Sequence, residues 1–405
     1  MVINKKEMEI WVKSAVKKGY NNNEIRELLK KNNYTDDEIK EILSVRGNIK
    51  PQPKSIAKLP VKAPEKSSFS KPKTKDGALD YSVGDDVPDE IREVYNLLSV
   101  TKKEVGKAII GQEKIIDAFM AALLCDGHVL LEGVPGIAKT LLVKALAEAS
   151  GCSSKRIQFT VDLLPSDILG VTTYTPNKGF ETIKGPIFAN FIIADEINRS
   201  PPKTQSAMIE AMQEKQVTIA KETYPLPKPF FVMANNNPLE TSGVYALPEA
   251  QVDRFLFKVL IGYPNSEQEV EIMENNITLR AFESFDIKPI LSPEKILEMQ
   301  RITKDIYIDE KIKKYIVKII NKTRKKDFEH GKYIDWGGSP RASIGVFIAS
   351  KAWALMNGRN YVIPQDVKEV VHLVLRHRII LNYKARAEGI DSDKIIDEIL
   401  NLVSI

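Results

Sequence analysis

The stretch LLEGVPGIAKTLLVKAL, residues 130–146, decides how this chain folds. An apolar run enters a turn that contains two glycines and a proline, and an amphipathic run follows directly. A strand that leads through a glycine-rich turn into a helix is the context of a phosphate-binding loop, whose backbone N–H groups face the phosphates. The sequence therefore predicts a nucleotide-phosphate site. Its expected members are Gly133, Val134, Pro135, Gly136, Ile137, Ala138, Lys139, Thr140 and Leu141.

The polar residues at the end of this loop carry its expected chemistry. Lys139 would reach between the two terminal phosphates, and the hydroxyl of Thr140 would hold Mg²⁺. The usual pattern has glycine directly before the lysine, whereas this chain has Ala138, so it matches a looser form of the motif. A methyl group fits there if the backbone angles stay helical. A helix start with incidental glycines is the alternative interpretation.

A second apolar run, FIIADEINRSPP at 191–202, ends in two carboxylates. If this run is a strand beside the phosphate loop in a parallel sheet, Asp195 would enter the magnesium shell. Glu196 would then activate the water in line with the γ-phosphate. A solvated strand end is the alternative, which is common for one acid but not for such a pair.

A third apolar run, FFVMANNNP at 230–238, ends in three asparagines. An amide at this strand tip can orient the attacking water by donating and accepting hydrogen bonds. Asn236 and Asn237 both qualify, and spacing does not decide between them. Asparagine is also common in turns before proline, so a simple turn remains an alternative for each.

Two arginines complete the set of candidate site residues. Arg254 directly precedes an expected strand, where its guanidinium could reach a neighbouring subunit's nucleotide as an arginine finger. Alternatively, it pairs with Asp253 or Glu249 at the surface. Arg341, near the start of a later helix, could contact the γ-phosphate and respond to its loss.

The order of apolar runs predicts two domains after residue 88. Short apolar runs alternate with helical patterns over 89–263, which is typical of a parallel α/β sheet with helices on both faces. The expected strands are HVLLEG (128–133), RIQFTV (156–161), ANFIIAD (189–195), PFFVMAN (229–235) and FLFKVLI (255–261). No strand is expected after Pro264. Helix-start residues and 3.6-residue periodicity there indicate a helical domain over 264–405, with one helical pattern over 364–381.

The first 88 residues have a different organisation. Residues 1–46 contain two similar amphipathic segments, and they predict a small helical module that is either a partner-binding element or a passive appendage. Residues 47–88 are rich in proline and lysine, which indicates an extended flexible linker. A basic segment that binds nucleic acid is the alternative for this stretch.

Composition limits the classes of function. The 405 residues carry a net charge of only +5, which gives no indication of a nucleic-acid partner. The two cysteines lack CxxC spacing, so neither a disulfide framework nor a zinc site is expected. The sequence contains no 18-residue apolar run and no signal peptide. We therefore expect no membrane span and a cytoplasmic location.

The order and wording of these segments resemble the MoxR group of AAA+ ATPases over about residues 90–390. The matching motifs are GVPGIAKT, ADEINRSPPKTQSAMIEAMQE, ANNNP, LPEAQVDRF and SPRA. The resemblance implies an AAA+ P-loop NTPase domain with an all-α lid domain, usually assembled as a hexameric ring with ATP between subunits. It also accounts for Ala138, because this group has alanine at that position of the phosphate-binding loop.

The same resemblance implies roles for the candidate residues. Lys139, Thr140 and Asp195 would bind ATP and Mg²⁺, and Glu196 would activate water. Asn236 or Asn237 would be the first sensor, Arg254 the finger and Arg341 the second sensor. Ile110, in the segment IIGQE, would lie against adenine. NNNP replaces the Thr-Gln-Asn-Pro that is commoner in the family, which leaves the choice of sensor open.

Two segments are expected to be hairpin insertions, at 173–188 and 216–230. In related ATPases such hairpins line the pore or hold the substrate, so Lys178, Phe180 and Lys221 are candidate contacts. Padding of a subunit interface is the alternative.

The leading functional hypothesis is an ATP-driven chaperone that remodels or matures protein clients, possible partners being von Willebrand factor A domain proteins. A nucleic-acid motor of the helicase or McrB type and a chelatase-like metal-insertion motor are the alternatives. A GTP switch is disfavoured because NKTR at Asn321 and NKGF at Asn177 both lack the aspartate of a guanine-reading NKxD motif.

Overall fold

The computed structural model describes residues 87–133, 139–176, 179–236, 244–275 and 282–405. It also describes the backbone of two short antiparallel strands, β1 (Thr74–Lys75) and β2 (Ala78–Leu79). All these residues belong to one compact unit, Phe69–Ile405. The module expected at 1–46 and nearly all of the linker expected at 47–88 lie outside the described residues, so both stay predictions.

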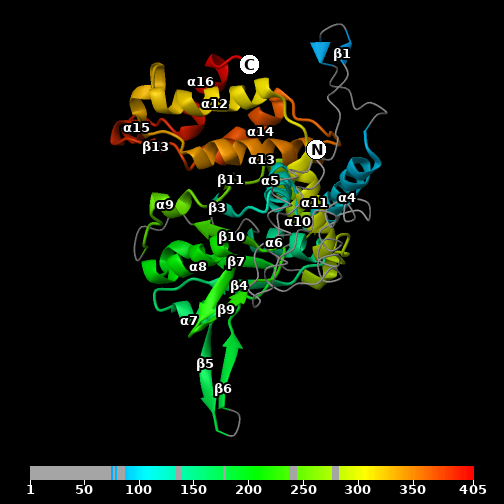
Figure 1. Cartoon of the computed structure of the whole chain (residues 1–405), viewed down its shortest axis with the longest axis vertical. Helices are drawn as coiled ribbons and strands as arrows, with labels where there is room; N and C mark the ends of the chain where they lie inside the picture. Colours follow the sequence, from blue (N-terminus) through cyan, green and yellow to red (C-terminus); the bar gives the residue numbers. More distant parts are fainter. Residues whose placement is uncertain are drawn as a thin grey trace, which may run out of the picture. The chain divides into compact units, whose positions relative to one another are not determined.

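Five parallel strands form the central sheet (Figure 1). They are β3 (Val129–Gly133), β4 (Ser154–Gln158), β7 (Phe191–Asp195), β10 (Phe231–Asn236) and β11 (Phe257–Ile261). Their order across the sheet is β11-β3-β10-β7-β4, and every neighbouring pair is parallel. Each strand overlaps one of the five apolar runs, although β4 shares only residues 156–158 with the run expected at 156–161, so the predicted α/β sheet is confirmed.

Helices cover both faces of the sheet because alternate residues of each inner strand enter different apolar clusters. Phe191 and Ile193 belong to the cluster that contains α4 (Asp89–Gly106), α5 (Glu113–Leu124) and α6 (Lys139–Ala149). Ile192 and Ala194 belong to the cluster that contains α7 (Pro165–Leu169) and α8 (Pro202–Glu214). This alternation fixes which face of the sheet each polar residue at a strand end occupies.

Both expected hairpins are present. The first consists of β5 (Gly170–Thr175) and β6 (Gly179–Lys184), and it projects beyond the helices around it (Figure 1). The second consists of β8 (Gln216–Ile219) and β9 (Glu222–Pro225). Gly170 has a φ of +115°, and a Cβ there would lie 2.3 Å from the carbonyl oxygen of Ile183, so the base of the first hairpin requires glycine.

The C-terminal part is mainly helical, as the sequence predicted. A short helix, α9 (Glu249–Val252), precedes β11, and the helices after it are α10 (Ser266–Asn275), α11 (Pro293–Asp305), α12 (Glu310–Lys325), α13 (Pro340–Met356), α14 (Pro364–Leu375), α15 (Tyr383–Ala387) and α16 (Ser392–Leu402). Three 3₁₀ turns, Ile197–Arg199, Phe282–Phe285 and Glu329–Tyr333, complete the helical elements of the described residues.

Two expectations for this region were wrong. Strands do occur after Pro264, because β12 (Ile334–Trp336) pairs antiparallel with β13 (Ile380–Leu381). The helical pattern over 364–381 also ends early, at Leu375. The reason is the segment 376–378, Arg-His-Arg, whose three side chains all bond to backbone carbonyls of residues 253–258.

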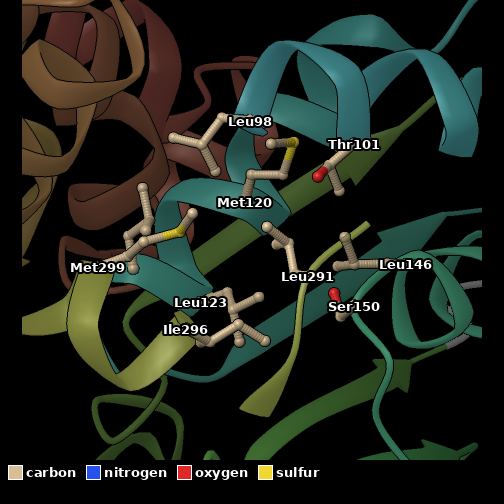
Figure 2. A pocket seen from close by; sticks show the side chains of 10 residues that line it. Leu98, Thr101, Met120, Leu123, Leu146, Ser150, Leu291, Ile296 and Met299 are labelled. Carbon is tan, nitrogen blue, oxygen red and sulfur yellow. The ribbon is translucent and has the colours of Figure 1, made fainter. Parts of the chain in front are cut away.

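The chain after the α/β sheet begins by packing on it rather than leaving it. The amide of Leu291 donates to the carbonyl of Ala149 at 3.1 Å, and Gln300 donates to the carbonyl of Leu123 at 2.8 Å. Figure 2 shows α11 residues such as Met299 facing Leu146 of α6 across a cavity of about 10 Å³, which is barely one water. One apolar cluster is therefore continuous from α4–α6 into the C-terminal helices. The domain ranges 89–263 and 264–405 stay predictions.

None of the described helices is long and apolar enough to cross a membrane.

Candidate active site

The predicted acids and Asn236 meet at one edge of the sheet, where the strands end. Because the strands are parallel, the carboxyl ends of β3, β10 and β7 lie side by side. The strand register pairs Asn236 with Glu132, and Ala234 with both Leu130 and Ala194. Asp195 is the next residue after Ala194. The structure therefore brings the end of the phosphate loop, the acidic pair and Asn236 to the same edge.

Asp195 is almost buried, and both oxygens of its carboxylate are occupied. Arg156 of β4 donates to Oδ2 through Nε at 2.8 Å and through a second guanidinium nitrogen. Asn235 donates its side-chain amide to Oδ1. The side chain of Asp195 is only 11% exposed, so this buried charge depends on these partners.

Asn235 is a site residue that the sequence analysis missed. Besides its bond to Asp195, its Oδ1 accepts the backbone N–H of Glu196 at 2.5 Å, so one buried amide positions both acids. Strand alternation could have identified it, because Phe231, Met233 and Asn235 point to the same face as Phe191, Ile193 and Asp195. Asn236 has the opposite parity, and its Oδ1 is buried with no hydrogen-bond partner among the described residues. Asn237 lies outside the described residues.

Glu196 has an unusual backbone conformation. Its φ of +56° lies in the left-handed region, which costs a non-glycine residue about 1 kcal/mol. The hydrogen bond from its amide to Asn235 holds this conformation. Its carboxylate accepts from Gln158 at 2.8 Å and from Arg199 at 3.1 Å. Glu196 is therefore fixed next to Asp195, with its carboxylate directed toward β4 and the turn that follows β7.

Lys139 and Thr140 form the first turn of α6, next to the end of β3. The ammonium of Lys139 donates to the carbonyl of Gly133. Burial lowers the pKa of Lys139, and the charges of Asp195, Glu132 and Glu196 oppose that shift. Lys139 is thus a cation close to three carboxylates. Val134, Pro135, Gly136, Ile137 and Ala138 lie outside the described residues.

The donor set fits a hard divalent cation. Asp195 supplies carboxylate oxygens at the edge of the sheet where α6 begins, and Thr140 in the first turn of α6 supplies a hydroxyl. Oxygen ligands are those that Mg²⁺ prefers. The carboxylate already has a cationic partner, the guanidinium of Arg156, at its Oδ2. A position where a buried carboxylate is neutralised by a cation is suited to a metal ion. When bound, Mg²⁺ would supply charge neutralisation for the phosphates.

The two candidate arginines lie at the opposite end of the sheet, where the parallel strands begin. The first residue of β11, Phe257, pairs with the first residue of β3, Val129, so Arg254 lies beyond the amino ends of both strands. The β3 strand alone spans about 13 Å at 3.3 Å per residue. That is too far for Arg254 to reach Lys139 of its own chain. The Nε of Arg254 is buried without a hydrogen-bond partner among the described residues.

Arg341 joins Arg254 at this end through Asp253. One of its guanidinium nitrogens lies 3.2 Å from Oδ2 of Asp253, the residue directly before Arg254. None of the described ion pairs joins Asp253 to Arg254, so the structure does not support the alternative in which they pair. Instead, Asp253 pairs with Arg341 and with the buried Arg378.

Arg378 was also missed by the sequence analysis. Its Nε donates to Asp253 at 2.8 Å, and its other nitrogens donate to the carbonyls of Asp253, Phe255, Leu256 and Val374. It therefore fastens the C-terminal helices to the segment that carries Arg254. Nothing in the local sequence distinguishes it from the two other basic residues of 376–378.

The remaining candidates are more peripheral. Ile110 and Leu141 are partly buried against the α4–α6 cluster. Phe180 is 80% exposed on the projecting hairpin, and its ring lies 5.4 Å from that of Tyr174, centroid to centroid. Lys221 lies exposed in the turn between β8 and β9. Lys178 lies outside the described residues.

The comparisons with known proteins agree with this geometry. Residues 128–257 match the ATPase family associated with various cellular activities (AAA), and residues 329–399 match the AAA lid domain. The chain is 45% identical over 307 residues to Chaperone MoxR1 of Mycobacterium tuberculosis, covering 75% of this chain and 80% of that protein. It is 43% identical over 314 residues to the uncharacterized protein YeaC of Bacillus subtilis, covering 77% of this chain and 96% of that one.

A crystal structure from Cytophaga hutchinsonii is similar in both sequence and fold. Its TM-score is 0.73 at 45% identity, and the match covers 78% of this chain and 97% of that chain. The phosphate-loop context and the strands β3, β4, β7 and β10 lie within the range that matches the AAA family, and α13 and α14 lie within the range that matches the AAA lid domain. The chain belongs to the MoxR family of AAA+ ATPases.

Proposed function

We propose that this ATPase binds ATP with Mg²⁺ at the carboxyl edge of its sheet and cleaves it at the subunit interfaces of a ring, the hexamer that the family resemblance implies, to reshape protein clients. The observation that carries the proposal is the separation of two residue sets. Lys139, Asp195 and Glu196 lie at one edge, whereas Arg254 and Arg341 lie at the other. A site that needs both sets takes them from two subunits.

Each residue has a defined task in this proposal. The loop ending at Lys139 holds the phosphates, and Asp195 and Thr140 hold the metal. Glu196 accepts the proton of the attacking water as a general base. Asn235 keeps both acids in place through its two hydrogen bonds. Arg254 of the neighbouring subunit stabilises the negative charge that develops on the γ-phosphate.

The lid and the finger segment, residues 253–256 with Arg254, would move together. Arg378 joins α14 to residues 253–256 through one ion pair and several backbone bonds. A change in one subunit's nucleotide that shifts the neighbour's Arg254 would therefore also move that neighbour's lid. The projecting hairpin, with Tyr174 and Phe180 exposed at 66% and 80%, offers an aromatic surface for a protein client.

The name of the relative Chaperone MoxR1 supports a protein client over the alternative motors. A von Willebrand factor A domain partner, the ring size and the cytoplasmic location stay predictions. Stimulation of ATP cleavage by single-stranded DNA, with a steep salt dependence, would instead favour a nucleic-acid motor. Turnover that requires a tetrapyrrole would favour the chelatase-like alternative.

Two variants test the shared site. Glu196→Gln is expected to bind ATP and not cleave it, and Arg254→Ala is expected to be inactive alone. Mixing the two should restore part of the activity, because some interfaces then combine an intact Glu196 with an intact Arg254. Absence of recovery at every mixing ratio would contradict a site shared between chains.

A third variant tests the phosphate loop. Lys139→Ala should lose ATP binding, and an unchanged ATP affinity would place the phosphates elsewhere.

A matched pair of exposed aromatics tests the client surface. The Glu196→Gln form with ATP should retain client proteins. Adding Phe180→Ser to it should abolish that retention, whereas adding Tyr383→Ser, at a residue 77% exposed on the lid, should not. Equal retention by both double variants would exclude the hairpin as the contact.

A further inference from the structure

Arg156 was not among the residues that the sequence singled out, yet it contacts one of the two acids of the site directly. Its guanidinium donates twice to Oδ2 of Asp195, and the same group donates to Oε1 of Gln158 at 2.6 Å. Among the described residues, Arg156 is the only cation within ion-pair distance of Asp195. Lys139 donates to the carbonyl of Gly133 instead.

The placement of Arg156 follows from the sheet. It pairs with Ile193 in the register of β4 and β7, so it lies on the same face as Asp195 and Asn235. The strand β4 is an edge of the sheet, and the Arg156 side chain is 50% exposed while that of Asp195 is 11% exposed. The acid is therefore fixed, whereas the arginine has open solvent into which it can withdraw.

A guanidinium and a divalent cation compete for this carboxylate. Asn235 donates one hydrogen bond to Oδ1 of Asp195, whereas Arg156 places a positive charge and two hydrogen bonds on Oδ2, so Oδ2 is the oxygen at which a metal would compete with Arg156. Two cations at one oxygen would also repel each other strongly in a partly buried position. We therefore expect binding of the metal at Oδ2 to displace Arg156.

We propose that Arg156 is a positioning residue that occupies the metal-binding oxygen of Asp195 when no nucleotide is bound and is displaced when Mg²⁺ enters with the nucleotide. The proposal rests on the proposed function, because it takes Asp195 as the metal ligand. Arg156 keeps the buried carboxylate neutralised and correctly oriented in the empty site. It also weakens the metal, because each binding event has to break its hydrogen bonds.

The test is a binding measurement without turnover. A fluorescent ATP analogue is titrated into the full chain at several Mg²⁺ concentrations and in EDTA. For Arg156→Gln, the ratio of affinity in saturating Mg²⁺ to affinity in EDTA should rise about tenfold, the scale of one lost charge-assisted bond. The variant loses the competitor of the metal and also a positive charge that attracts metal-free phosphates, so both changes raise the ratio. Lys155→Gln, on the same strand with its side chain on the opposite face, should leave the ratio unchanged.

The other outcomes are distinct. An unchanged ratio in folded Arg156→Gln would overturn the proposal, including the case in which only the melting temperature falls, which indicates a merely structural role. If Arg156→Gln does not fold, Arg156→Lys keeps the charge with fewer aligned donors and should give an intermediate increase, and no increase would overturn the proposal. Failure of the proposed function itself would show differently, as wild-type protein whose nucleotide affinity does not respond to Mg²⁺.

Discussion

Removing Arg378 tests how the lid is joined to the finger segment. The Arg378 side chain is only 4% exposed, and it donates to the Asp253 carboxylate and to four backbone carbonyls. Arg378→Ala removes these donors, so that Asp253 keeps only exposed or weaker partners such as Arg341, while the Phe255 carbonyl keeps His377. Breaking one side of a buried ion pair typically costs 3–5 kcal/mol, so we expect about 4 kcal/mol of lost unfolding free energy.

Arg341 provides the matched control because it pairs with the same carboxylate. Its side chain is 55% exposed, and an exposed ion pair contributes at most about 1 kcal/mol. The assay is urea denaturation of nucleotide-free protein, followed by far-ultraviolet circular dichroism. Arg378→Lys, which keeps the charge but not the planar set of donors, should fall between the two. Costs for Arg378→Ala and Arg341→Ala within about 1 kcal/mol of each other would refute the reasoning.

Three further predictions address the site, the pH dependence and the core. Asn235→Ala should lower the ATP cleavage rate at least tenfold because both acids lose their shared partner, and it should also cost about 1–3 kcal/mol of unfolding free energy because a buried hydrogen bond to Asp195 is lost; an unchanged rate in folded protein would contradict its role. Burial lowers the pKa of His128 to about 4, so this ring stays neutral in the fold while the unfolded chain takes up a proton below about pH 6.5. Its contribution is therefore complete above pH 6.5 and is lost toward pH 4, by about 1.4 kcal/mol per pH unit, and His128→Gln should reduce that slope in urea titrations at several pH values. Met299→Ala should cost about 2–5 kcal/mol by enlarging the cavity, whereas Met273→Ala, at a residue 66% exposed, should cost under about 0.5 kcal/mol.

The central sheet was predictable because its inner strands, such as β7 and β10, are buried on both faces. Four of the five strands are short apolar runs bounded by polar or turn-forming residues, and such runs carry their own signal, whereas the edge strand β4 contains a single apolar residue, Ile157. The edge at which Lys139, Asp195 and Glu196 gather followed from one rule, that parallel strands end together. The short ladder of β12 and β13 was missed because strands of two or three residues leave no periodic pattern.

The missed site residues depend on information that sequence spacing does not contain. Asn235 required knowing which asparagine has the parity of Asp195. Arg156 required the register of β4 against β7, since a lone arginine on an edge strand otherwise indicates only a solvated side chain. Arg378 bonds to residues more than 120 positions away, and no local pattern reports such a contact.

The most direct test of the account is a structure of the assembled protein with Mg²⁺ and a non-cleavable ATP analogue. The account predicts a triphosphate held between Lys139 and Asp195, with the metal at Oδ2 of Asp195 and an arginine of a second subunit at the γ-phosphate. Density for the triphosphate at any other place, or a site completed by the same chain's Arg254, would contradict it.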